Sequence, residues 1–387
     1  MNKKFFDFAN IFDKFKGLFS IGISDILSGV ISSLFWLYVA TLLEVDAYGE
    51  IFYIFAIGNL VSTFALIGSK NTLQVYVPKQ IKLDSAIFSL VLLIASVISL
   101  AVFFINPESF LGLYIFGAII FGLGISEVLA KKFYANYFIL LLSQKLLMIG
   151  FSIGLFHLIG TSGILLGTSL SFFVYLVIII KEFKNTKIDF SLLTPRFKFL
   201  FESYGQSIFS SLWSQLDKLM IAPLLGFTLL GNYQLGIQFI AVFQLIPFIV
   251  LKYTLPHDAS DNPNRNLKIL TVLFSIFSTV LIILISPIII PLFFEKFVYV
   301  VDIIQILSLS LIPFSINTAV YSSKILASEK SRIFMIGSII TVSVYAIGIV
   351  LFGEIIGIHG VAISYVLGMS VLTVYYFIID FKKLILK

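Results

Sequence analysis

Charged side chains inside long apolar stretches are the residues of this sequence that could do chemistry. Asp217 and Lys218 lie next to each other in the middle of such a stretch, where a charged residue costs about 2.5–3.5 kcal/mol in a membrane helix. Neighbours in a helix point about 100° apart, so the two need not pair with each other. They either form salt bridges that fix helix packing, or line a hydrated cavity and meet a charged substrate or coupling ion.

Four further charged residues extend this candidate binding site. Lys70 lies at the inner end of the second apolar stretch, and Lys145 lies a few residues inside the fifth. Together with Lys218, these lysines favour an anionic head group that enters from the cytosol. Alternatively, Lys70 or Lys145 is an ordinary snorkelling lysine, with its stem in lipid and its ammonium group in water. Asp25 and Lys252 share helix faces with other polar residues, and we include both in the site.

A stripe of hydroxyl groups leads up to Asp217. Its members recur at intervals of three and four residues, which places them on one helix face: Ser203, Ser207, Ser210 and Ser214. An unpaired polar face is costly in hydrocarbon, so it turns toward other helices or toward water. Hydrogen bonding between packed helices explains the serines equally well.

The residues that most enzymes need are missing. The sequence has no phosphate-binding G-x-x-x-x-G-K-[ST] motif and no cysteine, and its three histidines lie far apart. Asp258 and Asp261 faintly resemble an acidic motif of prenyl-pyrophosphate enzymes, but Pro256, Asn262 and Pro263 around them favour an ordinary turn. We therefore predict a protein that is not an enzyme, with no catalytic residues, no metal ligands and no cofactor beyond coupling to H⁺ or Na⁺.

The composition places these residues in a membrane protein. Of the 387 residues, 59% are hydrophobic and 12% are charged, whereas soluble domains carry about 25% charged residues. A soluble enzyme is therefore excluded. The net charge of +6 does not indicate nucleic-acid binding, because the placement of Lys and Arg in a membrane chain matters more than their sum. We expect membrane lipids as partners and no nucleic acid.

Hydropathy predicts an all-α protein with about twelve transmembrane helices. Each apolar stretch approaches the roughly 20 residues that a span requires. The expected spans are residues 20–43, 51–68, 86–105, 110–129, 139–159, 162–180, 204–225, 232–252, 268–289, 301–321, 333–352 and 358–379.

Basic residues support this topology. With twelve spans, 24 of the 26 Lys and Arg residues fall in segments on one side, which the positive-inside rule makes the cytoplasm. Both termini are then cytoplasmic, in a multi-pass protein of the plasma membrane. Residues 1–19, with phenylalanines at helical spacing between lysines, predict an amphipathic helix in the membrane interface.

The two halves of the chain contain matching motifs. Gly160-Thr-Ser-Gly163 before the sixth span parallels Gly357-Ile-His-Gly360 before the twelfth, and Tyr48-Gly49 parallels Gly231-Asn-Tyr233. Six spans in each half give both halves the same orientation in the membrane. We predict lobes at 20–180 and 201–380, a cytoplasmic linker at 181–200 and a basic tail at 381–387.

Four stretches together resemble a known family. They are Val39 to Gly49, Gln215 to Ile221 with Leu230 to Gly236 after it, Ser323 to Lys330, and Gly357 to Tyr365. On these residues the chain resembles the polysaccharide-biosynthesis flippases of the multidrug/oligosaccharidyl-lipid/polysaccharide (MOP) exporter superfamily.

The resemblance implies two pseudo-symmetric six-helix lobes in a V shape that opens alternately to each side. It implies a polyprenyl- or dolichyl-linked oligosaccharide as the partner, with Lys70, Lys145 and Lys218 at its pyrophosphate, and we expect a monomer. The sequence departs from the family pattern because no arginine lies within a span. Two alternatives are an ion-coupled drug or small-molecule exporter of the same superfamily, and a membrane enzyme of envelope glycan assembly.

Overall fold

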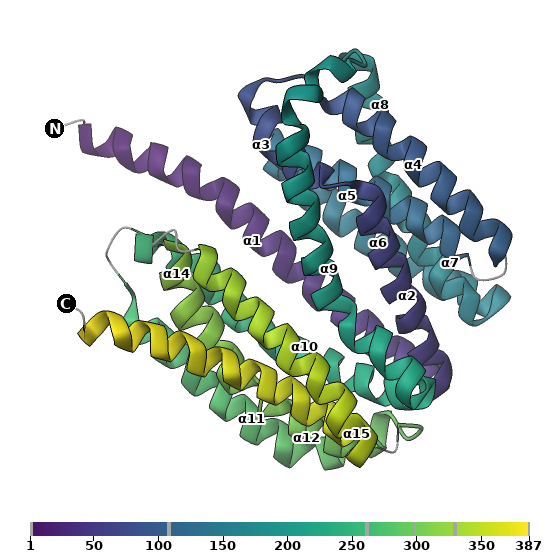
Figure 1. The fold of residues 1–387 in the computed structure, drawn as a ribbon, viewed down its shortest axis with the longest axis vertical. Helices are drawn as coiled ribbons and strands as arrows, with labels where there is room; N and C mark the ends of the chain where they lie inside the picture. Colours follow the sequence, from purple (N-terminus) through teal and green to yellow (C-terminus); the bar gives the residue numbers. More distant parts are fainter. Residues whose placement is uncertain (1–2, 107–109, 260–262, 298, 328–330, 386–387) are drawn as a thin grey trace. The chain divides into compact units, whose positions relative to one another are not determined.

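The computed structural model describes residues 3–106, 110–259, 263–297, 299–327 and 331–385, and every regular element among them is a helix (Figure 1). In the first half these are α1 (Lys3–Leu42), α2 (Val45–Leu66), α3 (Ser69–Tyr76), η1 (Val77–Lys79), α4 (Asp84–Ile105), α5 (Leu111–Ala130), α6 (Tyr134–Ile159), α7 (Thr161–Ser171), η3 (Phe172–Tyr175) and α8 (Leu176–Asn185). The second half follows with η4 (Phe190–Leu192), η5 (Thr194–Arg196), α9 (Phe197–Leu225), α10 (Phe227–Ala259), α11 (Arg265–Phe293), α12 (Val300–Ser308), α13 (Leu311–Ser315), η6 (Ile316–Ser322), α14 (Ser323–Ala327) and α15 (Ser331–Ile385).

The helices agree with about twelve membrane spans. Within the described residues, ten segments are long and apolar enough to cross a membrane. One of them covers Arg332–Asp380, which includes non-helical backbone at Ile356 and Gly357 and so contains two spans. α9 is not among the ten, because its serines and glutamines lower its hydropathy, but its 29 residues have the length of a span. Adding these two gives the twelve that the sequence predicts in a multi-pass membrane protein.

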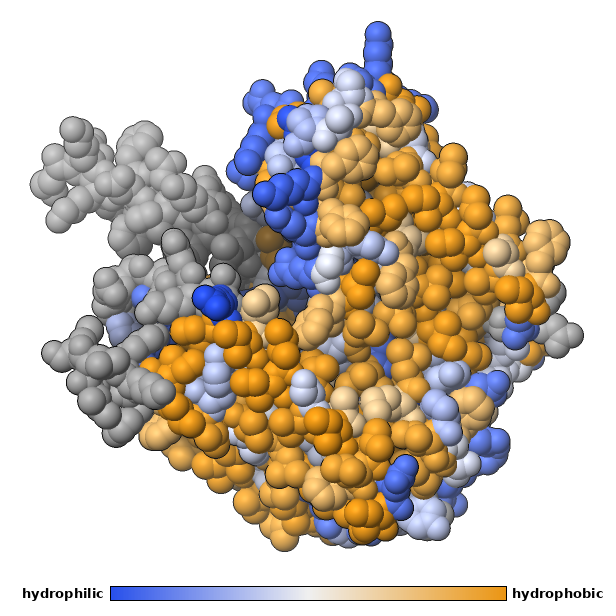
Figure 2. All heavy atoms as spheres, in the orientation of Figure 1, coloured by the Kyte–Doolittle hydropathy of each residue, from blue (hydrophilic) through white to orange (hydrophobic). Residues whose placement is uncertain are grey.

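The surface suits a lipid surrounding. Hydrophobic residues cover most of the face shown in Figure 2, and large side chains such as Leu93, Leu284 and Ile288 are each about two-thirds exposed, at 65%, 66% and 69%. Water would disfavour so much exposed apolar area, whereas acyl chains accept it. Polar backbone groups are paired inside the helices, as a span requires.

The chain forms two compact units whose boundaries fall inside helices. Unit 1 comprises Met1–Ile31 and Ile54–Gln215, and unit 2 comprises Ser32–Tyr53 and Leu216–Lys387. The division differs from the predicted lobes in two ways. The α1–α2 hairpin belongs to unit 2, and the whole of the predicted linker, 181–200, belongs to unit 1. The predicted interfacial helix is also not separate, since α1 runs without a break from Lys3 through the first span.

Close contacts explain where these boundaries fall. In unit 1, the backbone of Gly68 packs so tightly against α9 that an added Cβ would lie 2.5 Å from the carbonyl oxygen of Leu200. In unit 2, the Gly49 turn meets α10, where a Cβ would lie 2.1 Å from the carbonyl oxygen of Phe227. Glycine alone permits such approaches between backbones. The first half of α9 is therefore held to unit 1, and the α1–α2 hairpin is held to unit 2.

The predicted repeat is present in the backbone itself. Gly160 has φ 71° and ψ −146°, and Gly357 has φ 61° and ψ −140°, a region that is essentially limited to glycine. Three residues later, Gly163 and Gly360 each pack against the backbone of the preceding helix, at Leu155 and Phe352. The two halves thus make the same turn before their last span.

Candidate functional site

Lys70 is a half-buried lysine of unit 1. It lies in the first turn of α3, and its stem lies against Gly122 of α5, where an added Cβ would be 2.6 Å from Lys70 Cε. Among the described residues, no carboxylate comes within 4 Å of its ammonium group. Burial lowers the pKa of Lys70, because a low-dielectric surrounding disfavours the charged form.

Lys145 is the second such lysine of unit 1. It is half-buried on α6, next to the buried Gln144, which donates a hydrogen bond to Ser171 Oγ at 2.8 Å. It too has no acidic partner in the described part of the chain. Lys70 and Lys145 are thus two half-buried lysines whose charge no described acid of unit 1 balances within 4 Å.

Asp25 already has a partner. Its Oδ1 accepts a hydrogen bond from the hydroxyl of Tyr137 at 2.5 Å, which joins α1 to α6 within unit 1. A hydrogen bond to a carboxylate is stronger than one between neutral groups. Part of the hydrogen-bonding capacity of Asp25 is therefore used to hold two helices together.

Asp217 and Lys218 pair with each other, although the helical angle between neighbours does not require it. Lys218 Nζ lies 2.9 Å from Asp217 Oδ1, and the same oxygen accepts a bond from the Lys218 backbone nitrogen at 2.8 Å. The helical phase fixes only the direction of Cβ, and the flexible four-carbon stem of lysine reaches back to its neighbour. The pair reduces the charge that Lys218 offers to an anion.

Unit 2 also contains a group of hydrogen-bonded tyrosines. Tyr233 and Tyr345 are buried and hydrogen-bonded through their hydroxyls at 2.6 Å, and Gln244 donates to the hydroxyl of Tyr365 at 3.4 Å. The sequence pattern did not reveal this group, because its tyrosines come from three separate spans.

Lys252 lies about five helical turns after Gln234 on α10, in the same helical phase. It is exposed, whereas Gln234 is only 1% exposed. The side chain of Lys252 has a partner of its own. Lys252 and the buried amide of Gln234 therefore have different surroundings.

The polar stripe of α9 is partly exposed. Ser203 and Asp217 are buried, but Ser210 and Ser214 are exposed, and so are Glu202 and Gln206 on the same face at intervals of four residues. The neighbouring Ser211 accepts a hydrogen bond from Thr63 of α2 at 3.1 Å. One side of α9 is thus bonded within unit 1, and another presents polar groups that favour water over lipid.

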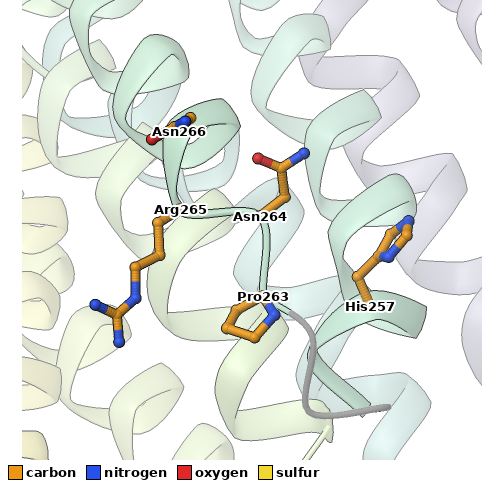
Figure 3. Close-up of a pocket in the computed structure, with 5 residues that line it drawn as sticks. All are labelled: His257, Pro263, Asn264, Arg265 and Asn266. Atoms are coloured by element: carbon orange, nitrogen blue, oxygen red, sulfur yellow. The ribbon is translucent and has the colours of Figure 1, made fainter.

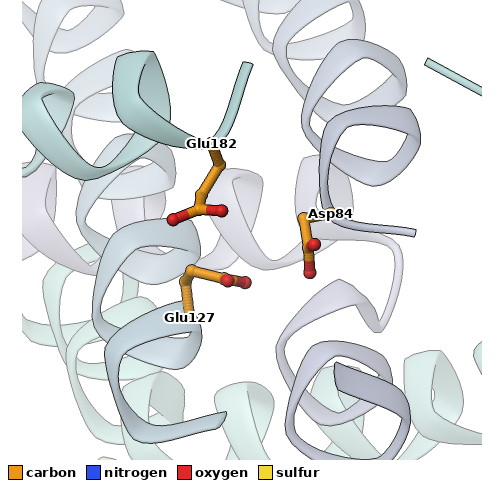
Figure 4. A group of neighbouring side chains, drawn as sticks. All are labelled: Asp84, Glu127 and Glu182. Carbon is orange, nitrogen blue, oxygen red and sulfur yellow. The ribbon is translucent and has the colours of Figure 1, made fainter. Parts of the chain in front are cut away.

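Sequence reasoning missed a buried cluster of carboxylates in unit 1. Asp84 begins α4, Glu127 lies in the last turn of α5 and Glu182 lies in the last turn of α8, and their carboxylates point toward one another (Figure 4). One oxygen from each lies within 4.8 Å of the others. Lys131 pairs with Glu127 at 2.9 Å and also with Glu182. The available signal was three acids at span ends on the side that is otherwise basic.

A surface hollow of about 400 Å³ lies at the loop between α10 and α11, lined by His257, Pro263, Asn264, Arg265 and Asn266 (Figure 3). Asn264 caps α11 by accepting a hydrogen bond from the Leu267 nitrogen at 3.1 Å, as expected for a turn. Asp258 forms an ion pair with Lys268 at 2.5 Å, and Asp261 lies outside the described residues. The contacts of Asp258 fit the turn interpretation of this segment.

Solved structures with the same fold are transport proteins. The lipid II flippase MurJ in an inward closed conformation aligns with 92% of this chain and 86% of its own, with a TM-score of 0.74 and 16% identity. An inward-facing MATE family multidrug transporter of the MOP superfamily aligns with 92% of this chain and 94% of its own, with a TM-score of 0.66 and 12% identity. A eukaryotic MATE transporter aligns with 96% of both chains, with a TM-score of 0.62 and 16% identity. No protein-family model and no curated protein matches the sequence. The chain has the MOP superfamily fold that the resemblance implied.

Proposed function

We propose that the protein is a flippase that moves a lipid-linked oligosaccharide across the plasma membrane by alternating access, for the synthesis of a cell-surface glycan. Its fold is shared with a lipid II flippase along most of both chains. The lipid carrier is a polyprenyl or dolichyl chain, and both termini of the protein lie in the cytoplasm. A gradient of H⁺ or Na⁺ drives the cycle, and the protein works as a monomer.

The observation that carries this proposal is the pair of lysines in unit 1 that lack acidic partners. Lys70 and Lys145 are half-buried, and no described carboxylate pairs with either. A buried cation without a counter-ion is costly, and a pyrophosphate group offers the oxygens that would compensate it. Lys218 contributes less, because Asp217 already neutralises it.

The exposed polar face of α9 fits the same substrate. Gln206, Ser210 and Ser214 lie on this face, within a helix that has the length of a span. Sugars carry many hydroxyl groups and need donors and acceptors along their route, whereas acyl chains do not. We therefore assign this face to the oligosaccharide and the two lysines to the head group.

Export of a drug is the second candidate, since two of the solved structures with this fold are MATE transporters. A cationic drug needs acidic residues that are free to receive it. The two acidic residues selected within spans are engaged, Asp25 with Tyr137 and Asp217 with Lys218. The unbalanced charges of the selected residues are positive, and they favour an anionic substrate over a cationic one.

Reconstituted vesicles test the assignment. The full chain is incorporated into vesicles with a fluorescent polyprenyl-pyrophosphate sugar, and its exposure on the outer leaflet is followed over time. We expect Lys70→Gln and Lys145→Gln each to slow translocation by about tenfold or more, since a lost charge-assisted bond is worth about 1.5–3 kcal/mol. Lys187→Gln, which changes an exposed lysine of unit 1, is the matched control and keeps the native rate.

Two results would contradict the proposal. Native rates in both lysine variants, at equal amounts of folded protein, would remove the head-group assignment. Transport of cationic dyes that is abolished by Asp25→Asn or Asp217→Asn, with no movement of the lipid-linked sugar, would establish the exporter instead.

A further inference from the structure

The carboxylate cluster of unit 1 has more negative charge than its protein partners balance. Asp84, Glu127 and Glu182 are 3%, 1% and 3% exposed. The described cation that pairs with them is Lys131, on Glu127 and Glu182. Asp84 Oδ1 is buried without a hydrogen-bond donor, and so is Glu127 Oε2. Buried charges require partners, so two orphaned oxygens that point into the same space indicate a missing cation.

The helix ends make this imbalance worse. Glu127 and Glu182 lie in the last turns of α5 and α8, where the helix dipole is negative and disfavours further negative charge. Only Asp84, in the first turn of α4, has a favourable dipole. The local backbone therefore adds to the need for a positive ion.

Other lysines near the cluster point elsewhere. Lys82, Lys132, Lys181 and Lys184 belong to the same three helix ends, but all of them are exposed. The hydroxyls of Ser85 and Thr186 bond with each other, and both donate to the backbone oxygen of Glu182. The cluster thus keeps three carboxylates against one ammonium group, a residual charge of about minus two if all ionise.

We propose that Asp84, Glu127 and Glu182 bind one hard metal cation, and that the residual charge favours a divalent ion such as Ca²⁺ over Na⁺. Carboxylate oxygens are the ligands that such ions prefer, at about 2.3–2.6 Å for Ca²⁺. Oxygens on one Ca²⁺ are then at most about 5.2 Å apart, and the separation of up to 4.8 Å fits this limit.

This site is distinct from the residues assigned to substrate, and its binding of metal does not depend on the proposed function. The ion joins the end of α8 to the ends of α4 and α5, which come from distant parts of the chain. It therefore stabilises the folded unit directly, and its presence is measurable without any transported molecule.

Metal binding by the purified full chain tests the proposal. After treatment with EGTA, binding of ⁴⁵Ca²⁺ is measured by equilibrium dialysis in detergent. The thermal midpoint is followed by tryptophan fluorescence with CaCl₂, MgCl₂ or NaCl, each balanced by choline chloride to constant ionic strength. We expect one Ca²⁺ per chain and a higher midpoint with Ca²⁺. A response to NaCl alone would overturn the preference for a divalent ion.

Isosteric amides identify the ligands. Glu127→Gln, Asp84→Asn and Glu182→Gln should each weaken metal binding by about 10–100-fold, a loss seen even for groups that only support a ligand. Each should also raise the midpoint in metal-free buffer, because it removes surplus negative charge. Asp380→Asn, in the corresponding place of unit 2, should leave binding unchanged.

The proposal fails if no saturable metal binding occurs, or if all three amide variants bind metal as the native chain does. It also fails if the amides lower stability in metal-free buffer, since the carboxylates would then be balanced without an ion. If an amide variant does not fold at all, it counts as a loss of stability and contradicts the proposal in the same way.

Discussion

The two halves of the chain carry charge at matching helix ends but balance it differently. In unit 1, the third span begins with Asp84, and the fourth is followed by Lys131, which pairs with Glu182 at the end of the sixth. In unit 2, the third span of the repeat carries Lys268 in its first turn, and Lys324 at the end of the fourth pairs with Asp380 at the end of the sixth, at 2.6 Å.

The two units differ at the start of the third span, where unit 1 has Asp84 and unit 2 has Lys268. Lys268 has its own acid, Asp258 at 2.5 Å, and also donates to Ser323 at 3.0 Å, so these lysines and acids of unit 2 are matched in number. An acid stands at the corresponding helix start in unit 1, and the charge there is not matched. Matching helix ends thus form balanced ion pairs in unit 2 and the proposed cation site in unit 1.

The largest effect is expected for Lys131→Met. It removes the lysine that pairs with two of three buried carboxylates, and breaking a buried ion pair costs about 3–5 kcal/mol. We expect a loss at the upper end of this range, about 5 kcal/mol in metal-free buffer, measured by denaturant titration of the detergent-solubilised protein. Lys132→Met, at the exposed next residue, is the control. Equal losses in the two variants would show that Lys131 does not compensate the cluster.

Lys268→Met should cost less, about 3 kcal/mol. It leaves a single uncompensated carboxylate, Asp258, whereas Lys131→Met leaves three. The same titration measures this difference, and the double replacement with Asp258→Asn should recover most of the loss because no buried charge then remains. A loss larger than that of Lys131→Met would reverse the comparison between the units.

Asp84→Asn should stabilise the protein by roughly 1 kcal/mol in metal-free buffer, the worth of about one pKa unit of like-charge repulsion. Added Ca²⁺ should reduce this advantage, since the native chain gains from the ion and the variant does not. Thermal midpoints with and without Ca²⁺ measure both effects. An advantage that is the same in both buffers would separate Asp84 from the metal site.

The smallest effect is expected for Lys324→Met. The pair with Asp380 is solvent-accessible, with the lysine side chain 56% exposed, and exposed ion pairs contribute about 0–1 kcal/mol. We expect less than 1 kcal/mol, and the effect should shrink further in high salt. A loss as large as that of Lys268→Met would mean that the Lys324–Asp380 pair stabilises unit 2 as strongly as the buried pair does.

Local patterns in the sequence predicted the helices well. Apolar runs gave the spans, and the glycines at 160 and 357 gave the repeat, because a left-handed turn before a tightly packed helix leaves glycine as the residue that fits. The predicted linker at 181–200 illustrates the limit of such reasoning. Its composition is polar, but contacts such as that of Gly68 with Leu200 hold it within unit 1.

The candidate site was less predictable because it depends on tertiary packing. Asp84, Glu127 and Glu182 each look like an ordinary acid at a span end, and only the folded chain brings them together. Helical phase likewise could not show that Lys218 reaches back to Asp217. The selection of Lys70 and Lys145 from charge in apolar segments stays a prediction of function, with their partial burial as its structural support.

Continuous helices, rather than loops, carry the chain from one unit to the other. The boundaries fall within α1, α2 and α9, after residues 31, 53 and 215. Any rotation of one unit against the other must then flex three rods at once, because a helix has no free joint where its backbone hydrogen bonds are intact. The stiffness of these three helices would therefore enter the energetics of such a rotation.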